Sequence, residues 1–180
     1  MKILNRLGRV IYENENIDNI KELVEEAVRE DIGLASANLI DTDLTGADLT
    51  SASLTGADLT GANLRGASLT GASLTGADLA GANLTGADLT YANLEGADLR
   101  GTNLDGANLR GTNLDGAILI CADLTGADLT SASLTGANLR GTNLDGAILI
   151  CADLTGARLD CTNLEDAILT GANLEGDKRR

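Results

Sequence analysis

Residues 56–79 read GADLTGANLRGASLTGASLTGADL, a run of five-residue units with one leucine in each. Leucine keeps this spacing without a break from Leu34 to Leu174, 29 times in succession. A period of five fits neither the helical period of about 3.6 nor the two-residue period of a strand, so the leucines share a core only if the chain turns at every unit. The pattern predicts a solenoid, whose stacked units bury one continuous apolar row.

The composition is aliphatic and acidic. Hydrophobic residues make up 43% of the chain, which has no Phe, Trp, His or Pro. Leu and Ala at fixed spacing exclude a disordered acidic chain. Residues 34–176 carry 5 basic and 18 acidic groups, hence −13 of the net charge of −14. An acidic rod repels nucleic acid and acidic membranes, so we expect no binding to either and a protein partner with a basic surface.

No apolar run approaches the roughly 20 residues of a membrane span. Acidic Glu13, Glu15 and Asp18 stand where a secretion signal would need an apolar stretch. These two features predict a cytoplasmic protein.

The segment 1–33 does not follow the five-residue pattern. Apolar residues at 3–4 and 10–12 predict a β-hairpin, and residues 20–28 have helical spacing after Asn19, a suitable N-cap. An amphipathic element placed here would cover the apolar interior and the open strand edge of the first coil. We therefore expect three parts: an N-terminal cap at residues 1–33, a solenoid at 34–176 and a charged tail at 177–180.

The unit Ala57-Asp58-Leu59-Thr60-Gly61 resembles the repeat of the pentapeptide-repeat family, and 28 consecutive units keep Ala or Thr two places before leucine. The resemblance covers about 140 of the 180 residues. It implies an all-β solenoid, a right-handed quadrilateral β-helix of about seven coils, with four units in each coil. In that fold the leucine and the small residue two places before it point inward.

The other positions of the unit fit such a coil. Short Asp and Asn acceptors before leucine suit turns, so many of these carboxylates are structural. Five units have threonine in place of the small alanine, and we expect each hydroxyl to bond locally to the backbone. These threonines are Thr42, Thr102, Thr112, Thr142 and Thr162.

Residues 106–127 and 136–157 are identical. With four units in a coil, the six units that separate the starts of the two copies amount to one and a half coils, so the copies are expected on opposite sides of the rod. Such repetition indicates recent repeat expansion or deliberate idealisation, and both origins stay open.

One copy contributes to a candidate apolar patch made by Ile148, Ile150 and Ile168. The patch is either a contact surface for a partner or a set of scattered surface aliphatics. Cys121 and Cys161 would lie two coils apart, beyond the reach of a disulfide, with Cys151 on the opposite face. We therefore expect three free thiols in a reducing compartment, with no metal and no cofactor.

Asp105, Asp145 and Glu165 are predicted to align on one face, with Asp123 and Asp166 nearby. The family resemblance implies that some members of similar length inhibit or protect bacterial type II topoisomerases by imitating double-stranded DNA. The acidic column is the candidate surface for such an activity here. Five arginines argue against a continuous phosphate-like surface: Arg65, Arg100, Arg110, Arg140 and Arg158.

A convex rod filled by leucine offers no evident pocket, and the chain has no histidine to act as a base, so we do not expect an enzyme. The leading prediction is a non-catalytic structural scaffold or protein-binding module that presents rigid polar faces. The alternative is the acidic DNA mimic. No helix is expected after Leu174, and relatives that dimerise do so through this end, so a homodimer and a monomer with a charged tail both stay open.

Overall fold

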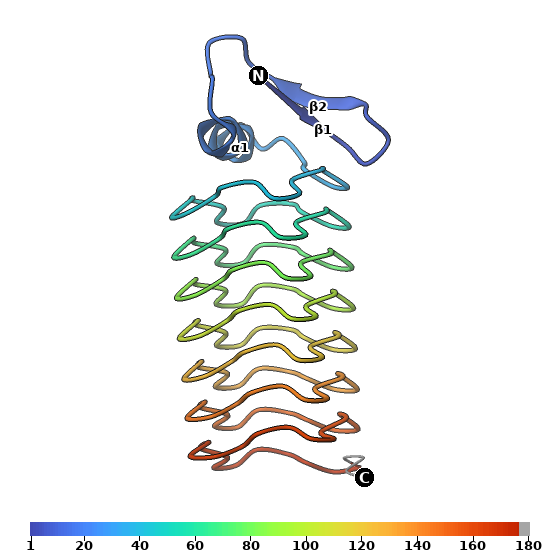
Figure 1. The fold of residues 1–180 in the computed structure, drawn as a ribbon, viewed down its shortest axis with the longest axis vertical. Helices are drawn as coiled ribbons and strands as arrows, with labels where there is room; N and C mark the ends of the chain where they lie inside the picture. The colour runs from blue at the N-terminus through green and yellow to red at the C-terminus, as the bar shows by residue number, and fades with distance from the viewer. Residues whose placement is uncertain (177–180) are drawn as a thin grey trace.

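The computed structural model describes residues 1–176; the charged tail expected at 177–180 lies outside the described residues. A rod of stacked coils carries a hairpin and one helix at its amino end (Figure 1). In the hairpin, β1 (Lys2–Leu4) pairs antiparallel with β2 (Val10–Glu13). Helix α1 spans Ile20–Arg29, and the Asn19 side chain accepts a hydrogen bond from the Glu22 N–H at 2.8 Å.

Parallel bridges between equivalent residues of successive coils define the repeat, from Asn38 with Asp58 to Asp153 with Asn173. A coil therefore holds four five-residue units, and the rod has four faces. We number the faces by their first leucine: face 1 begins at Leu34, face 2 at Leu39, face 3 at Leu44 and face 4 at Leu49. Each face recurs once in every coil, so faces 1 and 3 are opposite, as are faces 2 and 4.

The leucines fill the interior of the rod. Every repeat leucine from Leu34 to Leu159 is at most 4% exposed, and the alanines two places before them are buried as well. Backbone bonds join each coil to the next, as where the Leu59 N–H donates to the Asp78 carbonyl at 2.7 Å and the Asp78 N–H donates to the Ala57 carbonyl at 2.9 Å. Because each coil contacts only its neighbours, stability is distributed along the rod.

The corners require a left-handed backbone, which explains the glycines. Gly111, for example, has φ of +62°. Some corners use other residues, and several of their side chains extend over a glycine in the next coil. A Cβ on Gly111 would lie 2.6 Å from the ring of Tyr91, and one on Gly141 would lie 3.4 Å from Cys121 Sγ. At these corners a large side chain is thus accommodated by the absence of one in the next coil.

Helix α1 packs against the first coil of the rod. Leu23, Val24 and Ala27 are fully buried in the same apolar cluster as the first leucines. The Lys21 ammonium donates to the Thr45 carbonyl, and the Asp48 N–H donates to the Glu25 carboxylate, both at 2.9 Å. The corresponding N–H one coil later, that of Ser68, donates to the Ala47 carbonyl. Side chains of α1 therefore satisfy backbone groups that elsewhere bond to a coil.

The threonine hydroxyls bond differently from the local contact expected. Four of them donate to a leucine carbonyl in the preceding coil at 2.7–3.0 Å: Thr102, Thr112, Thr142 and Thr162. Thr42 bonds locally to the Leu39 carbonyl at 2.7 Å. The reason is that the inward position lies beneath the preceding coil, whose carbonyl is within reach; Thr42 belongs to the first coil and has no such neighbour.

Candidate functional site

All five acidic residues of the candidate partner surface lie on face 3 or its corner. Asp105, Asp145 and Glu165 each follow a leucine of this face and form one column, interrupted by Thr125. Asp105 and Glu165 are exposed and Asp145 is half-exposed. Asp123 precedes its leucine in the neighbouring column, and Asp166 stands at the corner with φ of 51°. The structure thus brings the predicted residues together along the carboxyl-terminal half of one face.

The three carboxylates of the column have no partner within residues 1–176. No hydrogen bond or ion pair engages the carboxyl groups of Asp105, Asp145 or Glu165 in the described part of the chain. Their backbone N–H groups donate to the side-chain oxygen of the asparagine two residues earlier, at 2.9–3.2 Å. The asparagine holds the backbone, so the carboxylate is left available for a partner.

Asp123 belongs to another class of carboxylate. It accepts hydrogen bonds from the Thr125 hydroxyl at 2.6 Å, the Thr125 N–H at 3.1 Å and the Asn143 side chain at 3.3 Å. The pKa of Asp43, Asp48 and Asp153 is lowered by bonds of the same kind from the threonine two residues later. The bond from the threonine hydroxyl has the larger effect, and the bond from its N–H the second largest. These carboxylates are structural, as the turn chemistry predicts.

Replacing Asp153 by Asn tests this class. Asn83 accepts the same two bonds from Thr85, at 2.7 and 3.0 Å, so the amide should keep the fold. The lowered pKa of Asp153 means that its charge stabilises the folded state above the unfolded pKa of about 4, and that this contribution disappears as the pH falls through the lower folded pKa. Thermal melts from pH 7 to pH 2 should show the wild type losing stability relative to D153N. A constant difference would contradict the assignment.

Most arginines of the rod lie on faces other than face 3. Arg100, Arg140 and Arg158 are on face 2 and Arg110 is on face 4, which leaves Arg65 on face 3. The four on faces 2 and 4 pair with carboxylates beside them: Arg100 with Asp98 at 2.5 Å, Arg110 with Asp128 at 3.1 Å, and Arg140 and Arg158 with Asp160 at 3.5 and 3.7 Å. Of these five arginines, Arg65 alone is on face 3, and it lies in the amino-terminal half of that face, outside the stretch from Asp105 to Glu165.

The apolar patch lies on face 4. Ile148 and Ile168 are bridged neighbours in successive coils, and Ile150 flanks the same leucine as Ile148. Ile168 is 45% exposed, whereas Ile148 and Ile150 are half-buried. The duplicated isoleucines Ile118 and Ile120 lie on the opposite face 2, as their offset predicts.

The hollows of the rod are shallow. One of about 310 Å³ lies between α1 and face 4, lined by Glu25, Val28, Arg29, Asp48 and Thr50. Within residues 1–176 no three His, Cys, Asp or Glu side chains gather as metal ligands, and the three cysteines are free and exposed. None of the helices in this part of the chain is long and apolar enough to cross a lipid bilayer.

The four-sided stack of leucine-filled coils defines the class: a β-helical solenoid. A family model, pentapeptide repeats, matches it with eight copies over residues 34–66, 67–106, 107–146 and 137–176. The chain belongs to the pentapeptide repeat family. No curated protein sequence matches it.

Among solved structures, HetL from the cyanobacterium Nostoc sp. strain PCC 7120 is 38% identical, with 79% of this chain and 70% of HetL covered and a TM-score of 0.38. HetL is described as involved in the regulation of heterocyst differentiation. A trypsin-treated variant of QnrB1, a plasmid-mediated fluoroquinolone resistance protein, is 21% identical, with 79% and 82% covered and a TM-score of 0.60. This likeness shows the shared fold, a right-handed β-helix.

Proposed function

We propose that this protein is a non-catalytic scaffold or protein-binding module that uses face 3 to bind a protein with a basic surface. The observation that carries the proposal is the column of Asp105, Asp145 and Glu165, whose carboxylates have no partner among residues 1–176. By contrast, Asp98 on face 2 is held by an arginine, and Asp128 on face 4 by an arginine and a threonine. Unpaired carboxylates keep their charge available for a partner and steer its approach.

The rod geometry supports binding without rearrangement. Every coil fixes the next through backbone bonds of 2.6–3.0 Å, so successive face 3 carboxylates stand at multiples of the strand spacing of about 4.8 Å. A surface held in this way loses little conformational entropy when it binds.

A second candidate is an acidic DNA mimic that inhibits or protects a type II topoisomerase. The observation that favours it is the placement of four arginines on other faces, which leaves the carboxyl-terminal half of face 3 acidic without interruption by a basic residue. The family resemblance supplies the precedent, and QnrB1, a fluoroquinolone resistance protein, has the same fold.

Two variants with equal charge change test both functions. D105N/D145N/E165Q neutralises face 3, and E95Q/D153N/E175Q neutralises three carboxylates on the opposite face 1. We would first measure gyrase supercoiling with rising concentrations of wild type and of each variant. Protection or inhibition by the wild type and the face 1 variant, but at least tenfold weaker action of the face 3 variant, would support the DNA mimic.

The binding-module proposal is tested by a pull-down from cell extract with the same three proteins. We expect a partner that is retained by the wild type and the face 1 variant and lost by the face 3 variant. Retention of the partner by all three proteins would reject face 3 as the binding surface. Loss of the partner with the face 1 variant alone would indicate that the binding surface is face 1. Because both variants change the charge equally, a purely non-specific charge effect would weaken them equally.

We further propose a cytoplasmic protein in which residues 1–33 act as the cap of the 34–176 rod and in which two rods associate through their carboxyl-terminal coils. Leu164, Leu169 and Leu174 are half-buried there, in contrast to the fully buried leucines of the middle coils. Burial of these side chains would favour the dimer. Light scattering at several concentrations gives the mass, and a monomer at all of them would reject the association.

A further inference from the structure

The duplicated segment places the same Ile-Cys pair in two different surroundings. Ile120-Cys121 lies on face 2 and its corner, and Ile150-Cys151 lies on face 4 and its corner. The N–H of Cys121 donates to the carbonyl of Arg140, and the N–H of Cys151 donates to the carbonyl of Thr170, both at 3.0 Å. The chain therefore contains one cysteine beside an arginine and an identical sequence without one.

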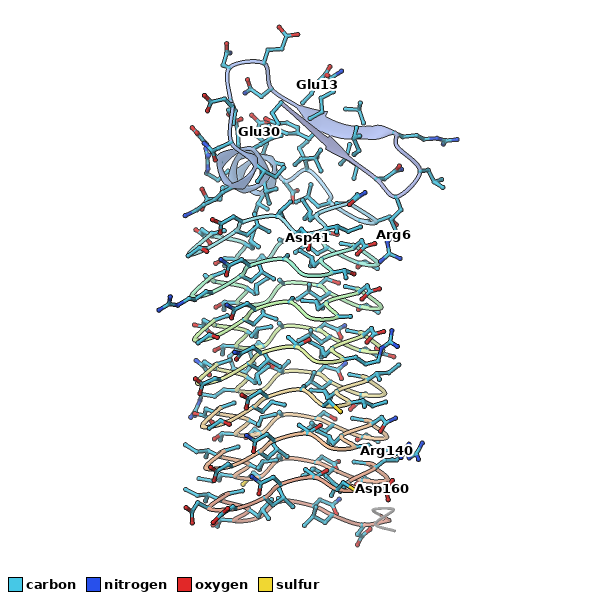
Figure 2. All side chains as sticks on the ribbon, viewed as in Figure 1. Arg6, Glu13, Glu30, Asp41, Arg140 and Asp160 are labelled. Atoms are coloured by element: carbon cyan, nitrogen blue, oxygen red, sulfur yellow. The ribbon has the colours of Figure 1, made fainter. Side chains whose placement is uncertain are left out.

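Cys121 also borders a hollow whose lining includes Arg140. The matching position beside Cys151 is occupied by Thr170. The hollow has a volume of about 250 Å³ and is lined by Ile120, Cys121, Arg140, Gly141, Asp160 and Cys161. Gly141 belongs to this lining, and a Cβ there would lie 3.4 Å from Cys121 Sγ. Arg140 and Asp160 lie on the same edge of the rod in neighbouring coils (Figure 2).

The charge around this hollow is unusual for a protein with a net charge of −14. Arg140 lines the hollow and Arg158 stands outside it, and both reach the carboxylate of Asp160, at 3.5 and 3.7 Å, so two arginines face this one carboxylate. The side chain of Arg140 is 52% exposed, which leaves guanidinium N–H groups open to solvent. An anionic ligand entering the hollow would meet a cation next to a thiol.

We propose that the Cys121 hollow is a modification site for anionic low-molecular-weight disulfides, with Arg140 binding a carboxylate of the reagent. The Cys121 thiolate attacks one sulfur of the disulfide, the S–S bond breaks, and a mixed disulfide forms while the other half leaves as a thiolate. The thiol proton has gone to solvent beforehand, and the small disulfide is the oxidant. Cys161 lies two coils away, at about twice the strand spacing of 4.8 Å, too far to resolve the adduct by forming a disulfide with Cys121.

The test compares two thiols and two probes. C151S/C161S retains Cys121, and C121S/C161S retains Cys151; serine is native at the same type of corner, as at Ser131. Each protein reacts with glutathione disulfide, which is anionic, and with cystamine, which is cationic, and the adducts are followed by intact mass spectrometry. For each thiol, the rate of reaction with glutathione disulfide is divided by the rate with cystamine. This quotient cancels differences between the two thiols in thiolate fraction and accessibility. We expect this quotient to be about threefold higher, or more, for Cys121 at low salt and to approach that of Cys151 in about 0.5 M salt.

Two further variants locate the cause. R140Q should remove the preference of Cys121 for the anionic probe, while T170R, which places an arginine beside Cys151 in the matching position, should confer it there. Equal quotients for Cys121 and Cys151 at low salt, or a preference unchanged in R140Q, would overturn the proposal. Far-ultraviolet circular dichroism of each variant checks that the coils are intact.

Discussion

Leu104→Asp is expected to unfold the coils around face 3 in the middle of the rod. Leu104 is 1% exposed and its N–H donates to the Asp123 carbonyl in the next coil. Leucine to alanine in a packed core costs about 2–5 kcal/mol, and a carboxylate adds the penalty of burying a charge without a partner. We expect a loss larger than that range in the free energy of unfolding, measured by urea denaturation.

The damage should be concentrated near the substitution because each coil contacts only its neighbours. Amide hydrogen exchange should accelerate most in residues 84–124, the coils directly above and below Leu104, and less in coils nearer the ends. The rod separates local from global unfolding in a way that a globular core does not.

Asn103→Asp is the matched control. It adds the same charge one residue away at an outward position, and Asp43 and Asp123 occupy the same column in other coils. N103D should therefore keep nearly the stability of the wild type. Unchanged stability of L104D, or equal losses in both variants, would contradict the burial of the repeat leucines.

The sequence predicts the coil because its period is a geometric property. Only a chain that turns at every unit can place Leu34 and every later repeat leucine on one axis, and the parallel bridges between successive coils agree with four units per coil. The hairpin of β1 and β2 and the helix α1 are also predictable from the sequence, because the apolar spacing and the N-cap at Asn19 are local signals.

The contacts between coils could not be predicted with equal success. Arg110 pairs with Asp128 in the following coil, and Thr102 bonds to the Leu79 carbonyl in the preceding one. In a repetitive chain every unit offers several such partners, and the rotamers of long side chains decide among them. The period alone does not show which arginines are held on faces 2 and 4.

A signal in the sequence does separate free from structural carboxylates on face 3. Aspartate in the order Asp-Leu-Thr, as at Asp123, is held by the threonine that follows leucine. An acid in the order Asn-Leu-Asp or Asn-Leu-Glu, as at Asp105 and Glu165, has its backbone held by asparagine and its carboxylate free. The cross-coil neighbour modifies this rule, because Asp115 on face 1 accepts bonds from Ser133 and Thr135.

Leu23→Asp is the second substitution with a large expected effect, since it removes the helix from the end of the rod. Leu23 is fully buried between α1 and the first coil, and a carboxylate there has no partner. We expect a loss of at least about 3 kcal/mol from the cap, in the range of a large core truncation. Hydrogen exchange in residues 1–33 should approach that of an unfolded segment before the middle coils are affected.

Loss of α1 should also make the protein associate. The Thr45 carbonyl and the Asp48 N–H would lose Lys21 and Glu25, and the first coil would present backbone groups that can pair with another chain. Light scattering of L23D should therefore rise with concentration, whereas Asn16→Asp, which adds the same charge at an exposed site of the cap, should match the wild type. A monodisperse L23D with protected amides in residues 34–53 would show that the first coil is stable without α1, and the helix would then serve a purpose other than covering the edge.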